Sequence, residues 1–151
     1  ERAGNAAYED VVMALQCMYN LDIGIKTEKM VELSELVKEI GNLQIPTNRA
    51  IVGDLLYQIE SGIIASWFKN CGKENELELT PFTAEMVGQK EPDIVIGKGS
   101  GIDTIGIMLD RLGIQATDEE RMALLVDVKE KAMELHRLLN MDEFKELAGS
   151  G

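Results

Sequence analysis

The sequence predicts a mostly α-helical fold of the α+β class, and three observations lead to this expectation. Apolar residues recur at intervals of three and four along most of the chain, which is the period of a helix with one buried side. The composition is 45% hydrophobic but only 5% aromatic, and eight methionines supply adaptable packing for helical cores. One short run, residues 93–96, is rich in branched side chains and predicts a strand.

The first third of the chain predicts two helices followed by a linker. Residues 8–18 carry apolar side chains at helical spacing. Thr27 is expected to cap a second helix, which Gly41 and the following asparagine end. Residues 42–46 form the predicted linker, because Pro46 cannot continue a helix and its ring disfavours helical backbone in the residue before it.

The middle of the chain, residues 48–71, is predicted to be helical on both sides of Gly62. Apolar residues before Gly62 have helical spacing. After it, residues 63–68 fit either a helix or a strand by periodicity alone, and we favour the helix. Residues 71–81 are polar and acidic and predict a loop.

A helix is expected after the predicted strand. Ser100 and Asp103 have the spacing of a Ser-x-x-Asp capping pair, in which side chains satisfy free amides at a helix start. Gly113 is expected to end this helix, because glycine readily adopts the left-handed backbone of a helix end.

Two further helices are predicted near the end of the chain. Thr117 and the glutamate three residues later predict a capped, long helix that runs to about residue 139, where Asn140 stops it. His136 lies on this helix without metal-like partners and is expected at the surface or at a subunit interface. A short helix is predicted at 142–147, and residues 149–151 are excluded as a flexible tail.

Charge and composition exclude several kinds of partner. A net charge of −12 would repel a nucleic-acid backbone or an anionic membrane surface. No apolar run approaches the roughly 20 residues that span a bilayer. Cys17 and Cys71 lack paired spacing and are interpreted as reduced thiols, so the predicted location is cytoplasmic.

Three segments, in this order, resemble the superfamily of isopropylmalate synthases, homocitrate synthases and HMG-CoA lyases, which are pyruvate carboxyltransferase-type barrel enzymes. The segments are ERAGN at 1–5, AIVG at 50–53 with ESGI at 60–63, and IVIGKGSG at 94–101. The resemblance covers nearly the whole chain. It favours the synthase branch, because the lyases largely end with the barrel.

The resemblance implies the tail of a longer protein. Residues 1–20 would close a catalytic (β/α)8 barrel with its last helix, residues 21–46 would form a linker helix or subdomain I, and residues 47–148 a C-terminal subdomain. These small helical and α/β lobes would pack across a homodimer partner and cover its active site. The short tail at 149–151 would lie outside them.

The implied function is a metal-dependent Claisen-type acyl transfer that condenses an acyl-CoA with a 2-oxo acid, as in 2-isopropylmalate or homocitrate synthesis. One alternative is an HMG-CoA lyase-like carbon–carbon lyase or aldolase. Another is a non-catalytic dimerisation module when the chain is isolated. The chain by itself is expected to be inactive.

Asn5 is the candidate metal ligand. The resemblance implies that this asparagine reaches a divalent metal in the intact enzyme, together with an aspartate and a His-x-His pair that this chain lacks. One amide oxygen without carboxylate or imidazole company does not hold a cation, so no cofactor is expected for the chain alone. The alternative role for Asn5 is an N-cap of a helix that begins at residue 6.

Tyr57 is the candidate catalytic residue. Synthases usually carry a histidine where Ile64 stands and often another where Ile59 stands, and isoleucine cannot transfer a proton. Tyr57 is the nearest polar substitute, although a half-buried aromatic with a hydrated hydroxyl is the favoured interpretation. The missing histidine at position 64 favours the lyase alternative.

Lys98, Ser100 and Glu60 are the candidates for contacts with CoA or substrate. A strand, a glycine-rich loop and a helix start can together hold an anion on backbone amides. Residues 97–101 match neither the P-loop nor the dinucleotide fingerprint. A tight turn with a helix cap is favoured, and contact of Lys98 with a CoA phosphate or a substrate carboxylate is the alternative.

Overall fold

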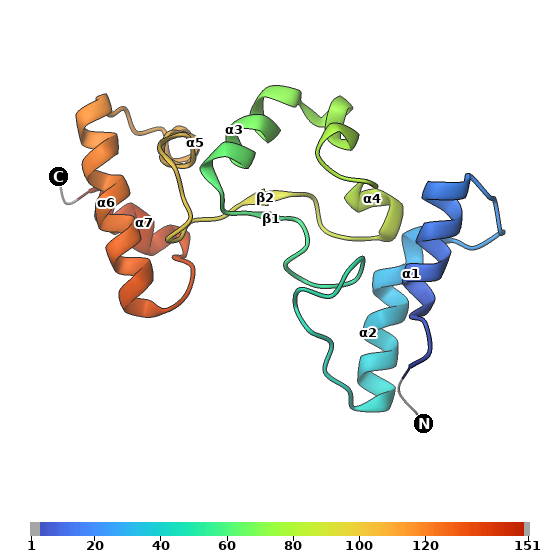
Figure 1. The fold of residues 1–151 in the computed structure, drawn as a ribbon. Helices are drawn as coiled ribbons and strands as arrows, with labels where there is room; N and C mark the ends of the chain where they lie inside the picture. Colours follow the sequence, from blue (N-terminus) through green and yellow to red (C-terminus); the bar gives the residue numbers. More distant parts are fainter. Residues whose placement is uncertain (1–3, 150–151) are drawn as a thin grey trace. The chain divides into compact units, whose positions relative to one another are not determined.

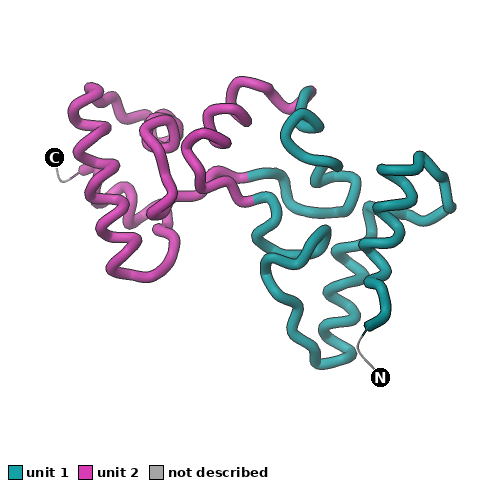
Figure 2. Tube along the Cα trace, in the orientation of Figure 1, with its two compact units in different colours: residues 1–57, 75–92 teal, residues 58–74, 93–151 magenta. Residues whose placement is uncertain are grey.

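The computed structural model describes residues 4–149 and divides the chain into two compact units (Figure 2). The first unit combines Glu1–Tyr57 with Asn75–Pro92, and the second combines Gln58–Glu74 with Asp93–Gly151. Helices dominate both units, which confirms the predicted mostly helical class. Whether residues 1–20, 21–46 and 47–148 act as separate parts of a longer protein stays a prediction.

The first unit is built from short helices around a small apolar core. Its elements are α1 (Tyr8–Met13), η1 (Ala14–Met18), η2 (Thr27–Lys29), α2 (Met30–Gly41) and α4 (Ala84–Val87) (Figure 1). The predicted helix at 8–18 is confirmed as α1 and the wider turns of η1. Asn42 ends α2 in the left-handed conformation, as expected. Thr27 does not cap a helix by its side chain, because it is itself the first residue of η2 and is buried.

The helix predicted before Gly62 is absent. Residues 47–57 form successive turns instead, and Ile51 takes a left-handed φ of +68°. The amide group of Gln89 ties this loop down by donating to the carbonyl oxygens of Ile51 and Gly53, at 3.1 and 2.9 Å. Gly53 has no room for a side chain, since a Cβ would lie 2.4 Å from the carbonyl oxygen of Arg49. The loop is therefore set by contacts distant in sequence rather than by local periodicity.

The second unit places helices around a two-residue parallel strand pair. Strand β1 (Gln58–Ile59) pairs with β2 (Asp93–Ile94), which confirms a strand within 93–96 (Figure 1). The helices are α3 (Gly62–Cys71), α5 (Ile102–Leu112), α6 (Asp118–Leu135) and α7 (Met141–Ala148). Helix α3 settles the ambiguity at 63–68. Element η3 (Lys73–Glu78), whose residues belong partly to each unit, replaces part of the predicted loop with short 3-10 turns kinked at Asn75.

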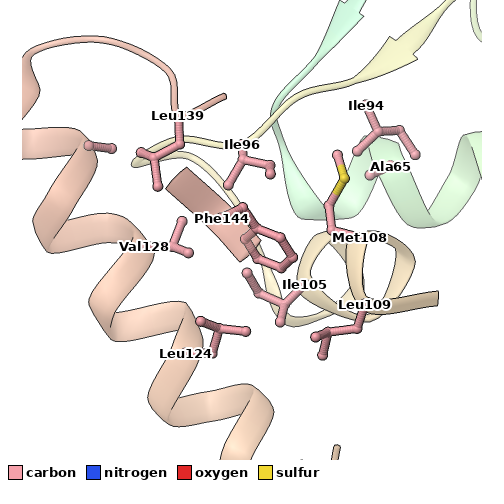
Figure 3. Close-up of a cluster of buried hydrophobic side chains, with 11 residues drawn as sticks. Ala65, Ile94, Ile96, Ile105, Met108, Leu109, Leu124, Val128, Leu139 and Phe144 are labelled. Atoms are coloured by element: carbon pink, nitrogen blue, oxygen red, sulfur yellow. The ribbon is translucent and has the colours of Figure 1, made fainter. Parts of the chain in front are cut away.

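The core of the second unit is an aliphatic cluster centred on Phe144. Figure 3 shows the Phe144 ring of α7 among side chains from α5 and α6, and the ring is fully buried. The other buried members are Ala65, Ile94, Ile96, Ile105, Met108, Leu109, Leu124, Val128, Ala132 and Leu139. A fully buried valine, leucine, isoleucine, methionine or phenylalanine side chain contributes roughly 1.5–3 kcal/mol by the removal of its apolar surface from water. This core fixes the ends of α3, α5 and α6, around which the candidate site lies.

The helix caps agree with the sequence in part. Thr117 and Glu120 cap α6 reciprocally, with the Thr117 amide 2.6 Å from Glu120 Oε2 and the Glu120 amide 3.3 Å from Thr117 Oγ1. Gly113 ends α5 with φ +70°, as predicted. The predicted Ser100–Asp103 capping pair is wrong by one residue. Gly101 caps α5, and its amide donates to Thr104 Oγ1 at 3.3 Å.

Helix α6 ends four residues earlier than predicted. His136 closes it in the left-handed conformation, with φ +53°. The chain then extends so that the Leu139 amide donates to the Ile96 carbonyl oxygen at 2.9 Å. Asn140 begins α7 rather than ending α6, since its Oδ1 accepts the Glu143 amide at 2.9 Å. Among residues 4–149, no helix combines the length and apolar character needed to cross a membrane.

Candidate functional site

The glycine-rich loop at 97–101 is held against the residue that follows β1. The Gly99 amide donates to Glu60 Oε1 at 2.7 Å. A Cβ on Gly97 would lie 2.4 Å from the same carboxylate oxygen and 2.8 Å from the Leu138 side chain. A side chain at 97 would therefore displace the ends of the Glu60 and Leu138 side chains, and the Glu60 carboxylate holds the loop by the Gly99 amide.

Ser100 closes the turn of this loop. Its side chain is 1% exposed, and its Oγ accepts the Gly97 amide at 3.0 Å while its own amide donates to the Gly97 carbonyl oxygen at 3.1 Å. These bonds occupy the hydroxyl oxygen as an acceptor inside the turn. The observed contacts of Ser100 are thus those of the tight turn, and its predicted contact with CoA or substrate stays a prediction.

A pocket of about 460 Å³ opens beside the loop within the second unit. Its lining residues come from the loop, from the end of α6 and from the segment after it: Glu60, Lys98, Ala132, Met133, His136, Arg137 and Leu138. Lys98 and His136 are exposed. The structure therefore brings Glu60 and Lys98 to one pocket, with Ser100 in the turn behind them.

Arg137 is held at the pocket by an ion pair. Its guanidinium donates to both carboxylate oxygens of Glu143, at 2.6 and 2.9 Å, and to the Leu138 carbonyl oxygen at 2.8 Å. The hydrogen bonds from Arg137, followed by that from the Asn140 amide, lower the pKa of Glu143 to about 2. The same pairing raises the pKa of Arg137. Both groups stay charged at neutral pH, and the hydrogen bonds to Glu143 and Leu138 set the direction of the Arg137 side chain.

Tyr57 belongs to the first unit and faces its interior. Its ring is 7% exposed, and its hydroxyl donates to the Phe82 carbonyl oxygen at 2.8 Å. Burial, and then the nearby Glu76 and Cys17 groups, raise the pKa of Tyr57 above its usual value of 10. The hydroxyl is thus protonated at neutral pH and already donates its proton to a backbone group.

Comparison with known proteins identifies relatives along nearly the whole chain, although no family model matches it. The homocitrate synthase AksA of Methanocaldococcus jannaschii is 35% identical over 147 residues, which are 97% of this chain and 35% of that protein. The 2-isopropylmalate synthase of Sulfurisphaera tokodaii is 37% identical over 148 residues, or 98% of this chain and 37% of that protein. The (R)-citramalate synthase CimA of M. jannaschii is 39% identical over 130 residues, or 86% and 26%.

The chain belongs to the isopropylmalate and homocitrate synthase superfamily. It spans between 26% and 37% of the length of these curated relatives. The synthases therefore contain a large region with no counterpart in these 151 residues, and the barrel stays a prediction.

Asn5, the residue that the resemblance to these synthases implies as a metal ligand, stands alone. It is exposed, and α1 begins only at Tyr8 after Ala7, whose side chain makes no cap. The N-cap role proposed for Asn5 is therefore wrong. Residues 4–149 contain no group of three or more His, Cys, Asp or Glu side chains that could hold a metal ion. One exposed amide does not fit a divalent cation on its own, so no chemical step is assigned to a metal in this chain.

The positions where synthases of this superfamily are expected to carry histidines are apolar in the structure as in the sequence. Ile59 ends β1 and packs against the core of the second unit. Ile64 lies on the first turn of α3 and is 38% exposed. Neither side chain can donate or accept a proton.

Sequence reasoning missed the meeting of His136 and Arg137 with Lys98. It placed His136 on a continuous helix that ran to about residue 139, where the side chain would have had no special environment. The early end of α6 instead brings residues 136–138 to the loop pocket. A histidine followed by a basic residue and two leucines carries no strong helix-stop signal, so local pattern alone did not reveal it.

Proposed function

We propose that this chain is the part of an acyl-CoA-dependent synthase that follows the catalytic barrel, in an enzyme that condenses an acyl-CoA with a 2-oxo acid. The observation that carries the proposal is the match of 97–98% of the chain to a homocitrate and an isopropylmalate synthase. In the proposed reaction, the carbon next to the thioester carbonyl loses a proton and bonds to the 2-oxo carbon. Hydrolysis of the thioester then releases CoA and a 2-hydroxy acid. The divalent metal expected of such an enzyme would be held mainly by barrel residues.

The role proposed for the second unit is to present the glycine loop to the substrates. The Glu60 carboxylate holds the loop by the Gly99 amide, which leaves Lys98 exposed between two glycines. A loop fixed in advance costs less entropy when a ligand binds than a mobile loop does. Lys98 and Glu60 are accordingly proposed as the residues through which this unit affects substrate binding.

A chimeric enzyme tests this function. The 147-residue segment of the M. jannaschii homocitrate synthase that matches this chain would be replaced by the chain, and CoA release from acetyl-CoA would be measured with several 2-oxo acids. The expected result is CoA release that depends on the 2-oxo acid, with none from the 151-residue chain alone. A folded chimera that releases no CoA with any of them would refute the proposal.

A matched pair of variants tests the role of Glu60 in the chimera. Glu60→Ala removes the carboxylate that holds the loop and should raise the KM for a substrate. Glu119→Ala removes an exposed carboxylate in the first turn of α6 and should leave the kinetics unchanged. Equal kinetics for the two variants would contradict a role of the loop in substrate binding.

A carbon–carbon lyase is the second candidate, and Ile64 is the observation that favours it. An isoleucine in place of the expected histidine removes a proton-transfer group that the condensation uses. Cleavage would rely on groups outside this chain. The chimera separates the two, because a lyase would split a 3-hydroxy-3-carboxyacyl-CoA into acetyl-CoA and a 2-oxo acid without net release of CoA.

A homodimer is also proposed. Helix α2 leaves several apolar side chains exposed, namely Leu33, Leu36, Val37 and Ile40 at 44–78% of their full area. Contiguous apolar surface beyond a few hundred Å² usually has a partner. Sedimentation at micromolar concentration should show a dimer or larger species, and a single 16.7 kDa species across that range would contradict it.

A further inference from the structure

The loop pocket of the second unit gathers basic side chains in an acidic chain. Three of its seven lining residues are Lys98, His136 and Arg137, whereas the whole chain has a net charge of −12. The carboxylate among the lining residues, Glu60, already accepts the Gly99 amide. Within the described residues, neither Lys98 nor His136 takes part in an ion pair. Two groups that can bind an anion therefore face one cavity without a protein partner.

The backbone around Lys98 lies close to the side chain of Glu60. A Cβ on Gly97 or Gly99 would lie 2.4 or 3.1 Å from the nearest Glu60 atom. The Ser100 hydroxyl and amide close the turn from the other side. Lys98 is thus carried by a hydrogen-bonded turn and lines the pocket.

His136 occupies a backbone position that usually favours glycine. Its φ of +53° lies in the left-handed region, while glycines end α4 and α5 in the same conformation. A side chain there raises the energy of the fold, and histidine adopts this backbone more readily than most other residues do. With histidine rather than glycine at position 136, an imidazole lines the pocket.

The remaining lining residues define the shape of a ligand. Arg137 is held by Glu143, so its charge is largely neutralised, and its contribution is to form the rim. Ala132, Met133 and Leu138 supply an apolar side. A volume of about 460 Å³ is suitable for a small molecule or for one end of a larger one.

We propose that this pocket binds the oxyanion group, a carboxylate or a phosphate, of a small ligand through Lys98 and His136, with the apolar part of the ligand against Met133 and Leu138. The two sources of such a group, a 2-oxo acid or the phosphates of CoA, rest on the proposed function. Binding of an oxyanion to the chain itself does not.

Nuclear magnetic resonance of the full 151-residue chain tests the proposal. His136 is the single histidine of the sequence, so its imidazole signals are unique. The chain would be titrated at constant ionic strength with inorganic phosphate, adenosine 3′,5′-bisphosphate and 2-oxoglutarate. Movement of the His136 signals, saturating with at least one of the last two, is the expected result. Saturation by the bisphosphate indicates a CoA phosphate, and saturation by 2-oxoglutarate indicates a substrate carboxylate.

Two lysine variants separate a site from general charge attraction. Lys98→Gln should weaken binding by about tenfold or more, as expected when a charged hydrogen-bond donor is removed. Lys145→Gln makes the same charge change at an exposed position of α7 outside the pocket and should leave affinity unchanged. Equal affinity for both variants, or unmoved His136 signals at about 10 mM of each ligand, would overturn the proposal.

A third variant keeps the test independent of folding and of the proposed function. His136→Asn retains a residue that tolerates the left-handed backbone and should weaken binding measured by calorimetry. If the chimera releases no CoA but the His136 signals still respond, the result supports the pocket proposal and contradicts the proposed function. If the chimera is active and the signals do not respond, the pocket proposal alone fails.

Discussion

Replacement of Gly62 by alanine should test how closely the starts of α3 and α5 approach each other. A Cβ on Gly62 would lie 2.5 Å from the Cα and 2.8 Å from the nitrogen of Gly101. Carbon atoms in favourable contact are about 3.5–4.0 Å apart, so the two backbones would have to separate by about 1 Å. Because both partners are backbone, no side-chain rotation can relieve the contact.

The expected effect is a loss of about 2 kcal/mol in the free energy of unfolding. Overpacking of this kind costs about 1–3 kcal/mol, and backbone partners favour the upper part of that range. The gain from replacing glycine by alanine is at most about 1 kcal/mol and is smaller at the first residue of a helix. Urea unfolding measures the change, with circular dichroism and the fluorescence of Trp67 on α3 as two independent signals.

Gly106→Ala is the matched control. Gly106 lies inside α5, and the nearest atom to its added Cβ would be Nη1 of Arg121 at 3.8 Å, an ordinary contact. Alanine there should raise the free energy of unfolding by about 0.5–1 kcal/mol. The two variants make the same chemical change in helical glycines of one unit, so their difference isolates the contact. A Gly62→Ala protein as stable as the Gly106→Ala protein would refute the argument.

His136→Gly should raise the free energy of unfolding by about 1 kcal/mol in the same urea experiment, because glycine adopts the left-handed backbone without the Cβ penalty; a less stable variant would mean that the imidazole stabilises the fold. Arg137 lowers the pKa of Glu143 to about 2 from 4.5, so this carboxylate stabilises the fold above pH 4.5 and its contribution is lost as the pH falls toward 2. Glu143→Gln should therefore flatten the decline of stability between pH 4.5 and 2, and an unchanged profile would contradict it. Tyr57→Phe leaves the Phe82 carbonyl oxygen without its partner and should cost about 1–3 kcal/mol in unfolding free energy, whereas a catalytic Tyr57 would also lower turnover of the chimera by about 100-fold or more.

The helices that the sequence predicted well are those with local signals. Thr117 and Glu120 bond to each other across one turn, and Gly113 needs only its own backbone freedom, so both appear in a short window of sequence. The turns at 47–57 were missed for the opposite reason. Gln89, more than thirty residues away, holds them, and apolar residues at helical spacing there gave a misleading pattern.

In the candidate site, too, local signals were predictable from the sequence and contacts between distant residues were not. The glycine loop and its neighbour Glu60 were recognisable from composition and order, but the capping pair moved by one residue because Thr104, rather than Asp103, bonds the helix start. The meeting of His136 with Lys98 depends on the pairing of Leu139 with Ile96, a contact 43 residues apart that turns the chain away from α6. The local hydrophobic periodicity does not predict such a contact.

The segments of the two units alternate along the sequence, which limits where the chain can be divided. Each unit consists of two segments of the chain, and a segment of the other unit lies between them in the sequence. A cut at any one position therefore cannot release one unit complete and free of the other's residues. A single genetic crossover inside residues 58–92 would join parts of both units to a foreign sequence. Recombination therefore preserves function most readily when it exchanges the two units together, and their segments, which alternate along the sequence, are expected to be inherited as one block.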